Sequence, residues 1–193
     1  MCEHSPMPAA RLLLPVVLAG LLSGCGSSDE PAPLPTRATP QRAELGWEER
    51  FPESGPALVF RAHRFAVTAD GWEAEIEVEN RTTVPWQVGG AAVDIASSFG
   101  VMLFPTGSLD EVEQRSQDGE LPGLRAAQQF VPPLPARLAP GGSWRGTIGA
   151  RGSLAAGLYV RLVYGPFVAV GDAPEGMQPG FSWITDHAHR LKR

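Results

Sequence analysis

Apolar and polar residues alternate with a strict period of two between residues 72 and 80. The apolar set is Trp72, Ala74, Ile76 and Val78, and the acidic set between them is Glu73, Glu75, Glu77 and Glu79. Successive side chains of a β-strand point to opposite faces, so this pattern predicts a strand with one buried face and one solvated face. Such strands are typical of antiparallel sheets that are covered on a single side.

The interval 57–68 predicts the preceding strand. Its alternation changes parity between Arg61 and Phe65, which indicates a β-bulge, because one inserted residue turns the following side chains to the other face. Asp70 and Gly71 are a typical hairpin-turn pair between the two strands. An antiparallel hairpin with a bulge in its first strand is therefore predicted.

Further strands are predicted where short β-rich runs are bounded by turn residues. The runs are 84–88, 92–104, 144–150, 158–164 with a continuation to 170, and 181–185. Residues 128–138 also have extended character, but three prolines favour an edge or unpaired segment there.

One helix is predicted inside this β-rich chain. Ser108 and Glu111 have the spacing of a capping box, and Gly119 is a suitable helix end. About seven short strands and this inserted helix predict an all-β fold, an antiparallel β-sandwich. Residues 57–193 have the size of a single domain.

Three segments of the predicted sandwich resemble a known family. They are Glu77-Val78-Glu79-Asn80, Leu138-Ala139-Pro140-Gly141-Gly142-Ser143-Trp144 and Gly157-Leu158-Tyr159-Val160-Arg161. A strand ending in Asn, a Pro-Gly turn and a Gly-x-Tyr strand in this order resemble bacterial immunoglobulin-like lipoprotein domains. The resemblance implies an immunoglobulin-like sandwich over residues 57–170. It carries over no catalytic residue, because such sandwiches recur without a shared function.

Residues 1–25 have the layout of a lipoprotein signal peptide. Arg11 precedes an apolar run at 12–22, and two small residues precede Cys25. The run is shorter than the roughly 20 apolar residues that a membrane-spanning helix needs. Met7 is an alternative start to Met1, because the whole pattern lies after it.

The motif Leu22-Ser23-Gly24-Cys25 resembles the lipobox of bacterial lipoproteins. The resemblance implies that a diacylglyceryl group is attached to Cys25 and that the leader is cleaved before it. The alternative is an ordinary cysteine in a removed leader, but its position at the end of the apolar run favours lipid attachment. Two or more acyl chains hold a protein stably on a membrane. The absence of Asp directly after Cys25 resembles lipoproteins destined for the outer membrane.

Residues 26–56 predict a disordered tether rich in Pro and Ser, although Trp47 and Phe51 are able to contact the domain. The formal net charge of −5 argues against a nucleic-acid partner. No cysteine follows Cys25, so no disulfide stabilises the domain. The predicted organisation is therefore a leader, a tether and one domain stabilised by burial alone.

The chain contains no local motif of a catalytic or cofactor-binding site. It has no Gly-x-Ser-x-Gly elbow, no Gly-rich phosphate loop that opens a helix and no His-Glu-x-x-His pattern. We therefore expect no enzyme activity and no cofactor, although a catalytic triad can assemble without a local motif.

The row of four glutamates between residues 73 and 79 is a candidate cation site. Successive side chains on one strand face lie about 7 Å apart, whereas calcium needs converging oxygen ligands. A solvated face with cross-strand arginine partners is the better interpretation, and the expected partners are Arg61 and Arg161.

His187 and His189 could share a metal ion, because they are two residues apart and would lie on one face of a strand. A third ligand with obvious spacing is missing, and His63 would have to arrive through the fold. Both histidines also lie near the end of the chain, where chains commonly fray.

Asn80-Arg81-Thr82 matches a glycosylation acceptor, but we interpret Asn80 as a turn residue.

These features predict a lipid-anchored, non-catalytic binding or assembly module of the bacterial cell envelope. Its partners would be the membrane, through the anchor, and an envelope protein or surface ligand. The loops at 105–128 and 171–180 are the candidate contact regions, because loops carry function on such scaffolds. The alternatives are a small-ligand or metal-handling lipoprotein that uses the C-terminal histidines, and a purely structural role.

Overall fold

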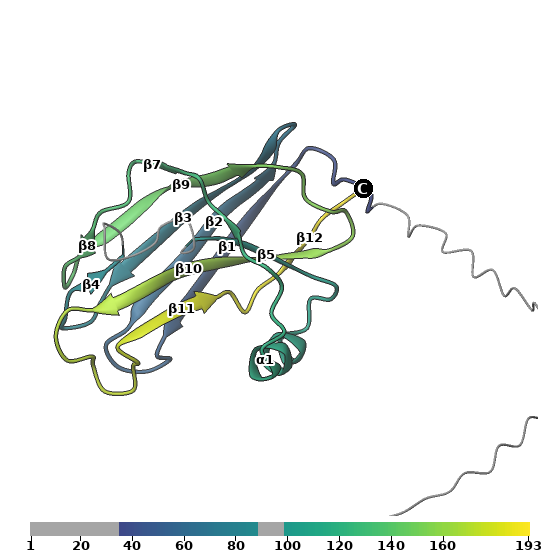
Figure 1. Cartoon of the computed structure of the whole chain (residues 1–193). Helices are drawn as coiled ribbons and strands as arrows, with labels where there is room; N and C mark the ends of the chain where they lie inside the picture. The colour runs from purple at the N-terminus through teal and green to yellow at the C-terminus, as the bar shows by residue number, and fades with distance from the viewer. Residues whose placement is uncertain (1–34, 89–98) are drawn as a thin grey trace, which may run out of the picture. The chain divides into compact units, whose positions relative to one another are not determined.

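The computed structural model describes residues 35–88 and 99–193, which form two β-sheets and one helix (Figure 1). The predicted signal peptide with Met1, Met7 and Cys25 lies outside the described residues, and so does the first part of the strand predicted at 92–104. Within the described part of the chain, no helix is long and apolar enough to cross a membrane.

The first sheet has the strand order β1-β2-β3-β9-β7. Its strands are Gln41–Phe51 (β1), Leu58–Val67 (β2), Gly71–Asn80 (β3), Ser143–Arg151 (β9) and Gln129–Val131 (β7). All neighbouring strands are antiparallel. The edge position of β7 confirms the prediction for residues 128–138.

The second sheet is built around the long strand β10, Tyr159–Ala169. One side of β10 pairs with β5 and β4, and the other side pairs with β12 and β11. The short strand β6 pairs with β5, and the short strand β8 pairs with β4. The bounds are Gly100–Phe104 (β5), Trp86–Gln87 (β4), Arg125–Ala126 (β6), Arg137–Leu138 (β8), Gly180–Ile184 (β11) and His189–Arg190 (β12).

Aromatic side chains join the inner faces of the two sheets. Phe60 of β2 lies 5.2 Å from Tyr164 and 5.6 Å from Phe167, measured between ring centroids, and stacks on Trp183 at 5.7 Å. The Tyr164 hydroxyl also donates to the carbonyl oxygen of Arg61 at 2.9 Å. The chain is therefore an all-β protein of two packed antiparallel sheets. The described residues contain twelve strands rather than about seven, because several are only two or three residues long.

The hairpin of β2 and β3 confirms the alternation read from the sequence. The register of this pair shifts between Ala62 and Arg64, which is the predicted bulge. At the turn, the Thr68 amide donates to the carbonyl oxygen of Gly71 at 2.9 Å. The apolar side chains of β3 are buried, and its glutamates lie on the opposite, more accessible face.

Strand β1 corrects the predicted tether, since residues 41–51 belong to the domain. Leu45, Trp47 and Phe51 are partly buried against the core, and β1 pairs with β2 along its length. The strand also alternates with period two, but Glu49 occupies one of its inward positions and hides the pattern. The segment between Cys25 and the described domain is therefore 26–34 rather than 26–56.

The helix α1, Leu109–Asp118, confirms the predicted helix and its end. Gly119 has a left-handed φ of 71°, and its amide donates to the carbonyl oxygen of Ser116. The predicted capping box is wrong, because the Ser108 side chain makes no capping hydrogen bond. The carboxylate of Glu111 instead accepts hydrogen bonds from the side chains of Thr106 and Arg115.

Candidate functional site

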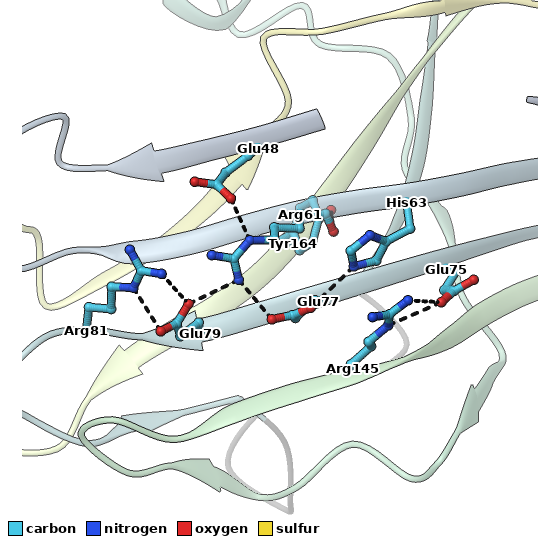
Figure 2. Close-up of polar contacts among 9 residues, drawn as sticks. All are labelled: Glu48, Arg61, His63, Glu75, Glu77, Glu79, Arg81, Arg145 and Tyr164. Atoms are coloured by element: carbon cyan, nitrogen blue, oxygen red, sulfur yellow. Dashed lines mark hydrogen bonds and ion pairs between the residues drawn. The ribbon is translucent and has the colours of Figure 1, made fainter. Parts of the chain in front are cut away.

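Ion pairs connect the strands on the outer face of the first sheet, which we call the glutamate face (Figure 2). Arg61 lies at its centre and donates from Nε to Glu48 at 2.6 Å. Its Nη1 donates to Glu77 at 2.8 Å and to Glu79 at 3.0 Å. The hydrogen bond to Glu48 raises the pKa of the Arg61 guanidinium above its ordinary range. A permanently charged arginine therefore joins β1, β2 and β3, as the sequence predicts for Arg61.

Other arginines bind the carboxylates at the two ends of the glutamate face. Glu79 accepts two hydrogen bonds of 2.8 Å from Arg81. Glu75 accepts a hydrogen bond of 2.6 Å from Arg145 of β9 and lies 3.2 Å from Arg64. These oxygen atoms are directed at separate guanidinium groups rather than at a common point: Arg64 and Arg145 lie on neighbouring strands, and Arg81 follows β3 itself. The arrangement is that of cross-strand ion pairs, which stiffen the sheet.

The glutamate face predicts a loss of stability in acid. The hydrogen bond from Arg81 lowers the pKa of Glu79, and the hydrogen bond from Arg145 lowers the pKa of Glu75, each below its ordinary 4.5. A carboxylate whose pKa is lower in the folded state stabilises the fold above the unfolded value, and this contribution is lost as the pH falls through the folded value. Asp186 contributes in the opposite direction, because partial desolvation raises its pKa and the stability linked to this group therefore rises as the pH falls.

We therefore expect the urea midpoint of unfolding to fall as the pH is lowered from about 5 to about 3. In Glu79→Gln this fall should be smaller, because one of the linked carboxylates is gone. Glu73→Gln is the matched control, since Glu73 is exposed and forms no ion pair with any described residue. An equal change in both variants would contradict the assignment to Glu79.

Arg161 is not a partner of the glutamates, and that prediction is wrong. Its side chain is fully buried on β10 and lies over the ring of Phe104, 5.7 Å from the centroid. Its Nη1 donates to the carbonyl oxygens of Thr185, at 2.6 Å, and Asp186. Its Nη2 donates to the carbonyl oxygen of Gly107 at 2.9 Å. The alternation of β10 did not reveal this burial, because segments distant in sequence cover both faces of the strand.

Arg161 thereby connects the segment before α1 to the segment after β11. Between α1 and β11 lies a groove of roughly 380 Å³, which we call the α1–β11 groove. Its lining includes Leu109, Val112 and Ser116 of the helix, and Trp183, Ile184 and Asp186 on the other side. Partial desolvation raises the pKa of the Asp186 carboxyl above its ordinary value, although the residue is exposed. The groove thus combines apolar side chains with two carboxyl groups, those of Glu113 and Asp186.

The two predicted contact loops differ in their packing. The loop at 105–128 contains α1 and forms one wall of the groove. The loop at 171–180 is anchored by Met177, which is buried against the core, and by a hydrogen bond of 2.8 Å from the Ala169 amide to the carbonyl oxygen of Pro179. The first loop therefore contributes to a groove, whereas the second packs against the core.

A buried carboxylate orients His187 beside this groove. Glu49 of β1 accepts hydrogen bonds from Trp183 Nε1 at 2.7 Å, from the His187 amide at 3.1 Å and from His187 Nδ1 at 2.7 Å. The imidazole stacks on Trp47 with centroids 5.5 Å apart. The His187 side chain is 53% exposed, whereas that of Glu49 is 6% exposed. Glu49 therefore holds the imidazole in one orientation and leaves part of the ring accessible.

His189 and His63 do not join His187 in a metal cluster. His189 of β12 pairs with Val160 of β10, and its ring centroid lies 6.4 Å from that of Phe65. Burial lowers the pKa of His189. His63 lies on the glutamate face, 3.3 Å from Glu77. No group of three or more His, Cys, Asp or Glu side chains in residues 35–88 and 99–193 is arranged to hold a metal ion.

Asn80 is more than a turn residue, because its side chain is fully buried. Its Nδ2 donates to the carbonyl oxygens of Val84, at 2.9 Å, and Leu138, at 3.1 Å. Its Oδ1 accepts from the amide of Thr82 at 2.9 Å and from the Thr82 hydroxyl at 2.7 Å. Asn80 thus holds the turn after β3 against β8 of the other sheet.

Sequence reasoning missed Glu49 and the α1–β11 groove. Glu49 and His187 are 138 residues apart in the chain, so no local motif connects them. The one available signal is a glutamate at an inward position of the alternating strand β1. No protein-family model matches the chain, and no curated protein or solved structure is significantly similar to it.

Proposed function

We propose that this chain is a lipid-anchored, non-catalytic binding or assembly module of the bacterial cell envelope. The observation that carries the proposal is Leu22-Ser23-Gly24-Cys25, which ends an apolar run of signal-peptide length. The lipid on Cys25 holds the mature protein on a membrane, with the outer membrane as the proposed destination. The domain is proposed to be an immunoglobulin-like sandwich that presents a binding surface to the envelope.

The α1–β11 groove is the proposed contact surface for an envelope protein or surface ligand. Leu109 is exposed, and Trp183 and Ile184 are half-buried in the wall opposite the helix. Grooves with apolar walls and a few placed polar groups are typical binding sites. The carboxyl group of Asp186 supplies such a polar group, and Arg161 fixes the two walls relative to each other.

Labelling with radioactive palmitate tests the anchor. The wild-type protein is expected to incorporate the label and to fractionate with membranes. Cys25→Ala is expected to lose all of the label, because the modified thiol is gone. Ser27→Ala is the matched control, since it changes a neighbour of Cys25 and leaves the Leu-x-Gly-Cys pattern intact. Equal label in wild type and Cys25→Ala would exclude the lipid-anchored function.

A small-ligand or metal-handling lipoprotein is the second candidate, and the Glu49–His187 pair is the observation that favours it. Carboxylates commonly orient metal-binding histidines in this way. The two functions differ in a calorimetric titration with zinc. For the non-catalytic binding module we expect no heat of zinc binding at micromolar concentration. Micromolar binding that disappears in His187→Ala and persists in His63→Ala would establish the second candidate instead.

A further inference from the structure

The chain enters and leaves the domain side by side (Figure 1). The Thr39 hydroxyl donates to the carbonyl oxygen of Arg193 at 3.2 Å, and Gln41 Nε2 donates to that of Lys192 at 3.2 Å. The Lys192 amide donates back to Gln41 Oε1 at 3.0 Å. The expectation that the C-terminal segment frays is therefore wrong, because β12 and these hydrogen bonds hold the segment beside the start of β1.

Five exposed basic residues gather at this end of the domain, which we call the basic end. They are Arg37, Arg125, Arg190, Lys192 and Arg193. A hollow of roughly 440 Å³ is lined by the three from the C-terminal segment, and a neighbouring one of about 290 Å³ is lined by the other two. None of the five forms an ion pair with a carboxylate of the described residues.

Contacts with the loop at 152–157 bring these residues together from three distant segments. Arg37 forms a β-bridge with Ala155, and Arg125 Nη1 donates to the carbonyl oxygen of Ser153 at 3.4 Å. The amide of Gly157 donates to the carbonyl oxygen of Leu191 at 2.8 Å. The loop at 152–157 is thus shared by both halves of the basic end. Arg151 does not belong to the basic end, because it lines a separate groove together with two acidic side chains, Asp70 and Glu73.

The basic end is also the end to which the lipid is joined. Nine residues, 26–34, separate Cys25 from the first described residue. Even fully extended, this segment reaches only about 35 Å, so the domain stays close to the bilayer. Electrostatic attraction to the bilayer acts within a Debye length of about 8 Å, which lies well inside that reach. Whether the basic end touches the membrane therefore depends on the charge of the lipid headgroups.

We propose that the basic end docks the domain onto the anionic lipid headgroups of the membrane that holds its anchor. This inference rests on the proposed lipid anchor. The protein as a whole has a net charge of −5, so the attraction is specific to this end and not a property of the whole molecule. Docking orients the domain with its tethered end on the membrane and its opposite end toward the envelope.

The test uses the lipidated mature protein, reconstituted into vesicles of phosphatidylcholine alone or mixed with phosphatidylglycerol. Ser153→Cys introduces an exposed thiol at the basic end for a fluorophore, and the thiol of Cys25 is occupied by lipid. A quencher on the lipid headgroups then reports contact. Quenching is expected to be stronger on the vesicles with phosphatidylglycerol and to fall at molar salt.

Two double variants distinguish the effect of the basic end on docking from the effect of the protein's net charge. Arg37→Glu with Lys192→Glu is expected to lower the ratio of docked to undocked protein by about tenfold or more. Arg50→Glu with Arg137→Glu makes the same change in charge at exposed positions near the other end of the domain and is expected to leave docking unchanged. Circular dichroism verifies that both variants are folded.

Equal quenching on both kinds of vesicle, or equal loss in both double variants, would overturn the docking inference alone. Failure of the mature protein to insert into phosphatidylcholine vesicles would overturn the anchor as well. The two failures are distinguishable, because insertion into neutral vesicles depends on the lipid and not on the basic end.

Discussion

Replacing Arg161 by methionine is expected to lower the free energy of unfolding by about 3 kcal/mol. The methionine retains apolar contact with Phe104 but removes the donors to the carbonyl oxygens of Thr185, Asp186 and Gly107. Urea denaturation measures the loss. A loss of less than about 1 kcal/mol, which is the effect typical of a surface substitution, would contradict this prediction. It would show that these hydrogen bonds contribute little to stability.

Arg145→Met is the matched control for this variant. Arg145 also binds through its guanidinium, but its side chain is 57% exposed on the glutamate face. Exposed ion pairs contribute about 0–1 kcal/mol, so the control should lose no more than that. A second readout is specific to the groove: in Arg161→Met, amide hydrogen exchange should accelerate in α1 more than in β3. Equal acceleration in both elements would indicate general destabilisation and not loss of the attachment of α1.

Asn80→Ala is expected to lower the free energy of unfolding by about 3 kcal/mol. The substitution leaves the buried carbonyl oxygen of Leu138 without its side-chain donor and the Thr82 hydroxyl without its acceptor. Trp86 is affected as well, because its Nε1 donates to that hydroxyl at 3.0 Å. The measurement is again urea denaturation.

Arg81→Ala is the matched control for Asn80, because Arg81 is the next residue and is exposed. It removes only the surface ion pair with Glu79, so its effect should be at most about 1 kcal/mol. If both variants lost the same stability, the buried contacts of Asn80 would not be the cause.

Local alternation made β3 and the bulged hairpin predictable from the sequence. The period of two in β3 depends only on which face of one strand is buried, and the change of parity at the bulge is likewise a local event. Strand β1 was missed because Glu49 stands at an inward position, where it accepts hydrogen bonds from Trp183 and His187. Glu49 is buried because of contacts with residues distant in the sequence, and its presence interrupts the apolar–polar alternation from which strands are predicted.

The candidate sites divide in the same way. Arg61 was predicted correctly from its place on the strand next to the glutamates, whereas Cys25, which was inferred from a contiguous motif, lies outside the described residues and stays a prediction. Arg161 was misassigned, and the α1–β11 groove was not foreseen, because both depend on how α1 and β11 pack around β10. The sequence predicted α1 itself but contains no local signal for the surface on which it packs.

The mass of the N-terminal peptide of the native protein, purified from membranes, tests the lipid anchor most directly. The account predicts a peptide that begins at Cys25 and carries a diacylglyceryl group on sulfur and an acyl chain on its amino group. A native protein that still begins at Met1 or Met7, with an unmodified Cys25, would contradict it.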